Sequence, residues 1–151
     1  MFHRNTLKRS ITRQRARKGA ASVEFAFCLP VLFFLTFGTI DVCTMLFLNE
    51  TASLAAYEGA RRGVGRGYTN ADSTARIVEF LDERGITYNA GNVVSYSSPG
   101  FDGADTLEHV TVTVTIPCDG NLILPSEMIG DLVVTGEVTM RKEYKNLDND
   151  T

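Results

Sequence analysis

The residues whose types and spacing suggest chemistry lie near the start of the chain, in the stretch Arg17–Gly38, RKGAASVEFAFCLPVLFFLTFG. A carboxylate, Glu24, stands where a basic segment gives way to an apolar one, and Gly19 stands five positions before it. If the chain is cut after Gly19, Ala20 gains a free ammonium and Glu24 becomes the fifth residue. A carboxylate that pairs with the ammonium of a neighbouring chain would fix the register between subunits. The pattern therefore indicates processing followed by ion pairing.

Glu24 has a simpler interpretation, which the sequence leaves open. The carboxylate lies six residues after Lys18, roughly 9 Å along a helix. An ionised group costs about 2.5–3.5 kcal/mol at the centre of a bilayer, and less near its surface. Glu24 would then lie among lipid headgroups and have no special partner.

The charge of the chain is divided unevenly. The net charge is −3. No acidic residue precedes Gly19, and the segment before it carries seven basic ones: Arg4, Lys8, Arg9, Arg13, Arg15, Arg17 and Lys18. From Gly19 onward, eight basic residues face 18 acidic ones. Such a division indicates that the two ends work in different places.

An apolar run from Phe25 to Leu48, interrupted by Asp41, follows the basic segment. About 20 helical residues cross a bilayer, so the run predicts a membrane span, and it favours a membrane flank over nucleic-acid binding for the basic segment. The positive flank predicts a cytoplasmic N-terminus. The run is longer than the roughly 7–15 residues of a secretory signal and lacks an Ala-x-Ala site, so it is expected to stay attached. Pro30 is expected to kink the helix.

Asp41 lies about 25 Å beyond Glu24 by helical rise, near the outer interface. An acidic side chain is tolerated at that interface, so Asp41 would need no special partner. Alternatively, Asp41 would cap a helix or contact another subunit. Further along, small residues form one narrow helical face, opposite Leu54, Tyr57 and Arg61: Ala52, Ala55, Ala56, Gly59, Ala60 and Gly63. This face would admit either a neighbouring backbone or the chain's own sheet. Glu58 and Arg62 are spaced for an ion pair.

A small domain follows the glycines after the helix. A second helix is expected over about Asp72–Arg84, with a capping box at Thr69 and a stop at Gly85. Its buried stripe would be Ile77, Phe80 and Leu81. Apolar and polar residues alternate in three later segments, which predicts three strands: 92–98, 110–116 and 134–140. Gly136 would mark a bulge in the third.

The expected fold is therefore α+β, with a long N-terminal transmembrane helix that continues into a small exported domain with a short helix and an antiparallel sheet of three or more strands. The expected parts are a basic leader, residues 1–19; the transmembrane helix and its extension, 20–64; and the exported domain, 65–151.

The sequence offers little support for catalysis. His3 lies in the leader, and His109 is expected as a half-exposed strand residue. An acidic cluster lacks the ligand spacing of a recognised calcium loop: Asp102, Asp105 and Glu108. The three cysteines are expected to be apolar fillers: Cys28, Cys43 and Cys118. We therefore expect no enzyme, no cofactor and no metal.

Three stretches of the sequence are similar to those of a known family. The basic leader, Gly19, AASVE and Phe25 resemble a type IV prepilin signal. GAASVEFAFCLPVLFFL from Gly19, FGTID ending at Asp41 and AAYEGARRGV from Ala55 resemble the TadE-like proteins, minor pilins or pseudopilins of the bacterial Tad (Flp) pilus system, with a type IV pilin-like fold. The resemblance covers Gly19 to about Val64, under a third of the chain.

The resemblance implies a function. A prepilin peptidase would cut between Gly19 and Ala20, and Glu24 would dock the subunit, with Phe25 beside it in the signal. Partners would be other pilins of the Tad machine, its inner-membrane platform and ATPase, and membrane lipid, but no nucleic acid. The exported domain is larger than expected of a major Flp pilin, which favours a minor pilin.

The protein is thus expected in the bacterial inner membrane as a single-pass protein, with the C-terminal domain in the periplasm or outside the cell, and as a component that joins a pilus. Its work would be assembly, in support of adhesion, colonisation or export. The alternative is an uncleaved single-pass protein whose exported domain binds a ligand or an envelope partner. A membrane-tethered hydrolase has almost no support from the residues.

Overall fold

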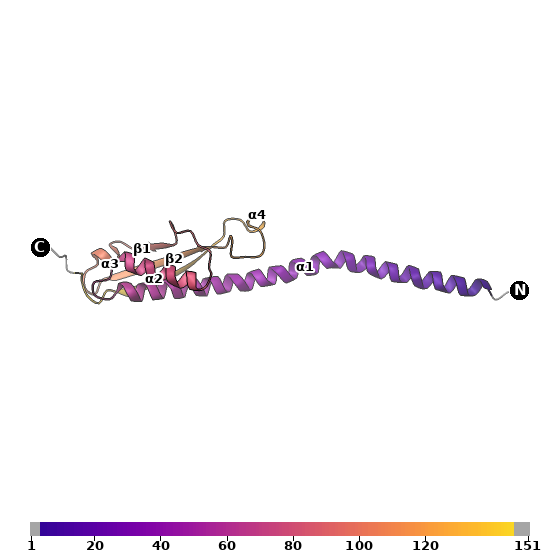
Figure 1. Ribbon diagram of the computed structural model, residues 1–151, viewed down its shortest axis with the longest axis horizontal. Coiled ribbons are helices and arrows are strands. Elements are labelled where there is room, and N and C mark those ends of the chain that lie inside the picture. The colour runs from indigo at the N-terminus through magenta and orange to yellow at the C-terminus, as the bar shows by residue number, and fades with distance from the viewer. Residues whose placement is uncertain (1–3, 147–151) are drawn as a thin grey trace. The chain divides into compact units, whose positions relative to one another are not determined.

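The computed structural model describes residues 4–146, and His3 lies outside this range. Helix α1 spans Arg4–Gly63, and it is followed by a shorter helix and three strands (Figure 1). The chain divides into two units, residues 1–39 and 40–151. The second unit therefore contains the last part of α1 as well as the sheet.

Helix α2, Asn70–Glu83, begins two residues earlier than expected because its N-terminus is capped by the preceding threonine. The Thr69 hydroxyl accepts a hydrogen bond from the backbone N–H of Asp72 at 3.3 Å, and the Asp72 carboxylate accepts one from the backbone N–H of Thr69 at 2.9 Å. The hydrogen bonds that the Asp72 carboxylate accepts from the backbone N–H and from the hydroxyl of Thr69 lower the pKa of the Asp72 carboxyl. The capping box predicted from the sequence is confirmed.

The end of α2 is also as predicted. Gly85 has a φ of +64°, the left-handed conformation that glycine adopts without strain. Its N–H donates to the carbonyl of Asp82 at 3.0 Å, and the N–H of Ile86 donates to the carbonyl of Leu81 at 3.1 Å. This pair of bonds is a Schellman motif, which satisfies carbonyls that the helix leaves unpaired.

The sheet has three antiparallel strands in the order β1-β2-β3. They are β1, Val94–Tyr96; β2, His109–Pro117; and β3, Val133–Arg141. Two short helical turns lie in the connections, α3 at Gly100–Gly103 and α4 at Ser126–Ile129. The long helix, the short helix and the sheet confirm the predicted α+β class.

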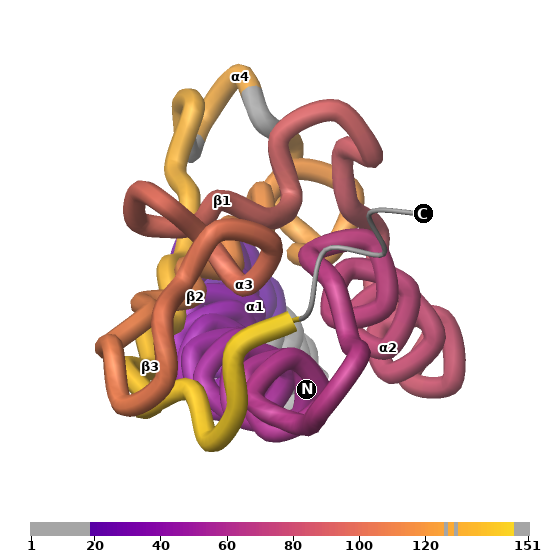
Figure 2. Tube along the Cα trace, turned by 90° about the vertical axis from the view of Figure 1, so that its left-hand side faces the viewer, coloured from indigo at the N-terminus to yellow at the C-terminus, as the bar shows by residue number. Residues whose placement is uncertain are grey.

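The core of the second unit forms where one face of β2 meets the helices. Alternate residues of β2 are fully buried: Val110, Val112, Val114 and Ile116. Ile77 and Leu81 of α2 are also fully buried, and Phe80 is nearly so, as their spacing predicted. Helix α2 lies beside the last part of α1 (Figures 1 and 2). Both helices therefore contribute to one hydrophobic core.

The prediction of a bulge at Gly136 is wrong. Gly136 pairs with Val114 in a regular ladder. A Cβ atom at this position would overlap the backbone of Ala52 and Ser53 in α1. Glycine stands here because the helix backbone passes directly over the strand.

Candidate processing and assembly site

The candidate cleavage site lies on the first unit of the chain. Gly19 and Ala20 are exposed residues of α1, and a Cβ atom at Gly19 would meet nothing within 4 Å. A glycine inside a helix lowers its stability by about 1 kcal/mol relative to alanine. Gly19 is therefore exposed, and it is a weaker helix former than the two alanines that follow it.

Glu24 lies four residues, about one helical turn, after Ala20. Its side chain is exposed, and within the part of the chain whose side chains are described it makes no hydrogen bond or ion pair. Phe25 beside it is 60 % exposed. If the chain begins at Ala20, Glu24 lies near the positive end of the shortened helix, where an acid is stabilised.

Large apolar side chains are exposed along the helix after Glu24. Those of Phe27, Val31 and Leu35 are 78 %, 65 % and 66 % exposed. The polar side chains among them are satisfied within the helix, since the hydroxyls of Thr36 and Thr39 donate to carbonyls one turn earlier at 2.8 and 2.7 Å. The helix from Gly19 contains a stretch long and apolar enough to cross a membrane. Together these features fit a membrane-anchored protein.

Asp41 does not face outward, although the sequence suggested a docking or interfacial acid. It is 5 % exposed, and its two carboxylate oxygens accept hydrogen bonds from the backbone N–H groups of Ile123 and Leu124, both at 2.9 Å. The carboxylate thus holds the connection between β2 and β3 against the helix. We therefore assign Asp41 to this connection rather than to a neighbouring subunit.

The small-residue face of α1 packs within its own domain. Four alanines on it are fully buried: Ala52, Ala55, Ala56 and Ala60. A Cβ at Gly59 would overlap Ile77 of α2, and one at Gly63 would overlap the ring of Phe101. The Ser73 hydroxyl donates to the carbonyl of Gly59 at 2.8 Å. Of the two partners that the sequence left open, the face meets the chain's own sheet and α2.

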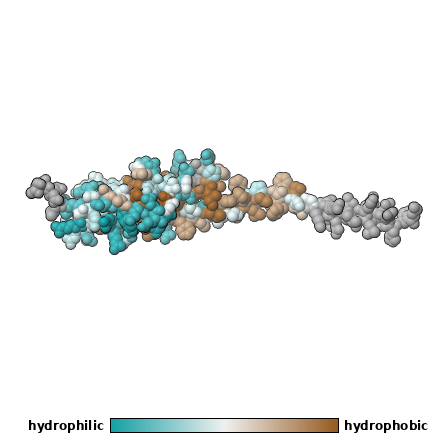
Figure 3. Space-filling view, in the orientation of Figure 1, coloured by the Kyte–Doolittle hydropathy of each residue, from teal (hydrophilic) through white to brown (hydrophobic). Residues whose placement is uncertain are grey.

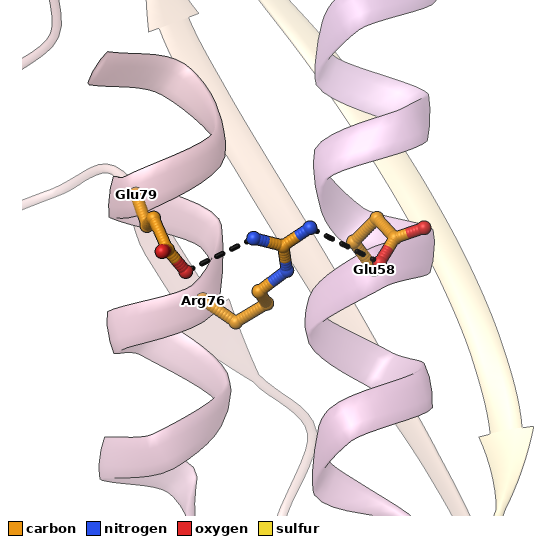
Figure 4. A network of polar contacts seen from close by, with 3 residues as sticks. All are labelled: Glu58, Arg76 and Glu79. Carbon is orange, nitrogen blue, oxygen red and sulfur yellow. Dashed lines mark hydrogen bonds and ion pairs between the residues drawn. The ribbon is translucent and has the colours of Figure 1, made fainter. Parts of the chain in front are cut away.

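Charged side chains join α1 to α2 at the surface. The guanidinium of Arg76 lies 3.6 Å from the carboxylate of Glu58 and 2.9 Å from that of Glu79 (Figure 4). Arg62 stacks over the ring of Tyr68, with its guanidinium carbon 4.1 Å from the centroid. The expected pairing of Glu58 with Arg62 is wrong, because a cation on α2 takes the carboxylate.

Lys142 is a buried cation that sequence reasoning missed. Its ammonium donates hydrogen bonds to the carbonyls of Gly63 and Tyr68, at 2.9 and 3.0 Å, just where α1 ends. A cation is stabilised at the carbonyl end of a helix. Burial nevertheless lowers the pKa of Lys142. The residue follows the last strand, and no spacing rule singles it out.

Among the remaining candidates for chemistry, Asp102 and Asp105 make structural contacts. His109 is exposed on β2, the Asp102 carboxylate accepts from the N–H of Asn70 at 3.0 Å, and Asp105 pairs with Lys145 at 2.8 Å. Among the residues that the structure describes, no group of three or more His, Cys, Asp or Glu is placed to hold a metal. All three cysteines are free: Cys28 and Cys43 are exposed, and Cys118 is buried.

Comparison with known proteins bears on the helix alone. A family model described as "TadE-like protein" matches residues 19–61. No curated protein and no solved structure matches the chain. The matched range begins at the candidate processing glycine and ends within the AAYEGARRGV stretch. The resemblance seen in the sequence is confirmed there, because residues Gly19 to Arg61 are similar to the TadE-like family.

Proposed function

We propose that this protein is a minor pilin or pseudopilin of a Tad (Flp) pilus or secretion machine. A prepilin peptidase removes the leader after Gly19, and the shortened helix then joins other pilins. The observation that carries the proposal is the placement of Gly19, Glu24 and Phe25, all exposed within the TadE-like segment. The protein acts through assembly and has no catalytic role.

The charge of the leader explains why the helix must be cleaved before it can leave the membrane. Its seven basic residues hold the N-terminus on the cytoplasmic side, because moving them through a bilayer costs on the order of 20 kcal/mol in total. Cleavage removes this barrier in one step. The helix that remains is apolar and is extractable from the inner membrane by the platform and ATPase of the machine.

Extraction requires new partners for the apolar side chains of the helix. The transfer of each large apolar side chain from an apolar environment into water costs about 1.5–3 kcal/mol of free energy. Sister helices of neighbouring pilins supply the replacement surface. Glu24 sets the register among them by pairing with the ammonium of a neighbouring subunit, in a setting where few charges compete.

The small-residue face indicates that the two parts of α1 make different contacts, the later part within its own domain and the earlier part with other chains. Because the small residues between positions 52 and 63 pack on the chain's own sheet and on α2, we infer that the earlier part of α1 contacts other pilins. The second unit is then the periplasmic or extracellular domain of the assembled subunit. Such a domain suits a minor component that supports adhesion, colonisation or export.

Complementation tests the proposal against an uncleaved membrane protein with a ligand-binding domain. Cells that lack the chain receive the wild type, Gly19→Ala or Gly19→Val, and their surface pili are counted. We expect the wild type to restore pili, Gly19→Ala to be tolerated, and Gly19→Val to fail while still inserting in the membrane. Equal numbers of pili with wild type and Gly19→Val would favour the uncleaved alternative.

A further inference from the structure

The connection between β2 and β3 has an apolar tip that the assembly proposal does not use. We call Asn121–Gly130 the β2–β3 foot. Ile123 is 57 % exposed and Met128 is 62 % exposed. Glu127 is the only charged residue in the segment. Exposed apolar side chains that gather at one end of a domain mark surfaces that meet a partner or a membrane.

The foot is fixed in place by hydrogen bonds. The carboxylate of Asp41 in α1 accepts hydrogen bonds from the backbone N–H groups of Ile123 and Leu124, both at 2.9 Å. At its base, the Asn121 amide donates to the carbonyls of Thr87 and Pro117, both at 2.8 Å. The backbone of Ile123 and Leu124 is thus held against the helix at the Ile40 end of the second unit, and α4, which carries Met128, projects beyond it (Figure 2).

The helix beside the foot is apolar as well. Val42, Leu46 and Phe47 are 60 %, 68 % and 68 % exposed. Figure 3 shows hydrophobic surface where the foot approaches the helix. At the Gly63 end of the same unit three cations are exposed, Arg61, Arg62 and Arg66, beside the exposed side chains of Leu107 and Tyr144. Exposed cations on α1 therefore lie at the end of the second unit opposite to the foot.

The end with the foot is the one that the membrane-spanning segment enters. About 20 residues after Lys18, the last charge of the leader, bring the chain to the outer edge of the hydrocarbon core, close to Asp41. Two backbone N–H groups of the foot donate hydrogen bonds to this carboxylate, and these bonds replace water at the edge of the hydrocarbon core. Continuity with the span argues for lipid rather than for a protein as the occupant of the surface.

We propose that the β2–β3 foot inserts Ile123 and Met128 into the interfacial region of the bilayer that anchors the chain. It would act as a second membrane contact that holds the domain on the surface before any extraction. Because one acid and no cation lie in the segment, insertion depends on apolar burial and not on anionic lipid. The proposal rests on membrane anchoring and not on pilus assembly.

Tryptophan fluorescence tests this proposal, because the chain contains no tryptophan. The full chain is reconstituted in phosphatidylcholine nanodiscs as Ile123→Trp, Met128→Trp or Tyr144→Trp. Tyr144 is the matched control, since it is 56 % exposed and follows Glu143, whose N–H bonds to Val64 near the end of α1. Retained hydrogen-exchange protection of β2 and β3 verifies the fold of each variant.

The expected result is emission shifted to shorter wavelength and several-fold stronger quenching by brominated phosphatidylcholine for Ile123→Trp and Met128→Trp than for Tyr144→Trp. The difference should persist in high salt. Quenching equal to that of the control would overturn the proposal. So would emission shifted to shorter wavelength without quenching by brominated lipid, because the probes would then be covered by protein.

Discussion

Gly136 of β3 lies directly against Ala52 of α1, backbone to backbone. A side chain at Gly136 would overlap the carbonyl group of Ala52 and the amide nitrogen of Ser53. Ala52 is fully buried by this contact. The sheet therefore packs on the same helix that carries the TadE-like segment, and their close approach depends on small residues at the crossing.

Substitution of Gly136 should destabilise the second unit. Gly136→Ala forces the strand away from the helix, and overpacking of this kind costs about 1–3 kcal/mol. We expect this loss in the free energy of unfolding, measured by chemical denaturation of the full chain in detergent. Thr135→Ala, at the exposed neighbouring position, should change it by less than about 0.5 kcal/mol. Equal stability of Gly136→Ala and wild type would show that helix and strand are not in contact.

Removal of the Lys142 ammonium should loosen the end of α1. Lys142→Met leaves the buried carbonyl of Gly63 without its donor, at a cost of about 1–3 kcal/mol at pH 7, while the carbonyl of Tyr68 keeps its hydrogen bond from the Asn146 amide. Arg141→Met, at the exposed neighbouring position, is the control and should have little effect. A Lys142→Met variant as stable as the control would mean that water replaces the ammonium.

Lys142 also predicts a dependence on pH. Burial lowers the pKa of Lys142 in the folded chain, so the unfolded chain binds more protons between that lowered pKa and the ordinary value of about 10.4. Through this window the wild type should gain stability relative to Lys142→Met as the pH rises, and below it the difference should be constant. Denaturation of both proteins from pH 7 to pH 10 checks the sign. A difference that falls with rising pH would contradict the burial of the ammonium.

Loss of the Asp41 carboxylate should free the connection between β2 and β3. Asp41→Ala removes the acceptor of two N–H groups, and each unsatisfied donor costs about 1–3 kcal/mol. Hydrogen exchange at Ile123 and Leu124 should become at least about tenfold faster. Asp119→Ala removes an exposed acid and should leave these rates unchanged. Unaltered exchange rates in Asp41→Ala would contradict this role and would favour a docking role for Asp41.

Neutralisation of Glu24 should leave the protein inserted but impair its assembly. Removing one partner of a charge pair in an apolar setting costs about 3–5 kcal/mol, so Glu24→Gln should lower co-purification with partner pilins at least about tenfold. Glu50→Gln changes another exposed acid on the same helix and serves as the control. Unchanged co-purification and pilus number in Glu24→Gln would place the carboxylate among lipid headgroups.

The elements of this fold that could be predicted from the sequence are those with local signals. The capping box at Thr69, the stop at Gly85 and the alternation in β2 each depend on residues close together in the chain, and all three are confirmed. The small-residue face was also visible in the sequence. Its partner was not, because helical spacing is the same for a neighbouring chain and for the chain's own sheet.

Contacts between distant segments are what the sequence could not reveal. Asp41 meets residues more than 80 positions later, and Lys142 reaches back to Gly63 over 79 positions. Gly136 was interpreted as a bulge because a glycine in a strand has the same local signature whether the ladder is irregular or another backbone passes close by. These positions depend on how the connections fold back, which no periodicity encodes.

The central claim, that the working chain begins at Ala20, is tested most directly by the intact mass of the protein recovered from sheared pili or from the purified machine. The account predicts a mass lacking residues 1–19, with an N-terminal peptide that starts at Ala20 and retains Glu24. A machine-associated chain that still carries the basic leader, in cells whose prepilin peptidase is active, would contradict it.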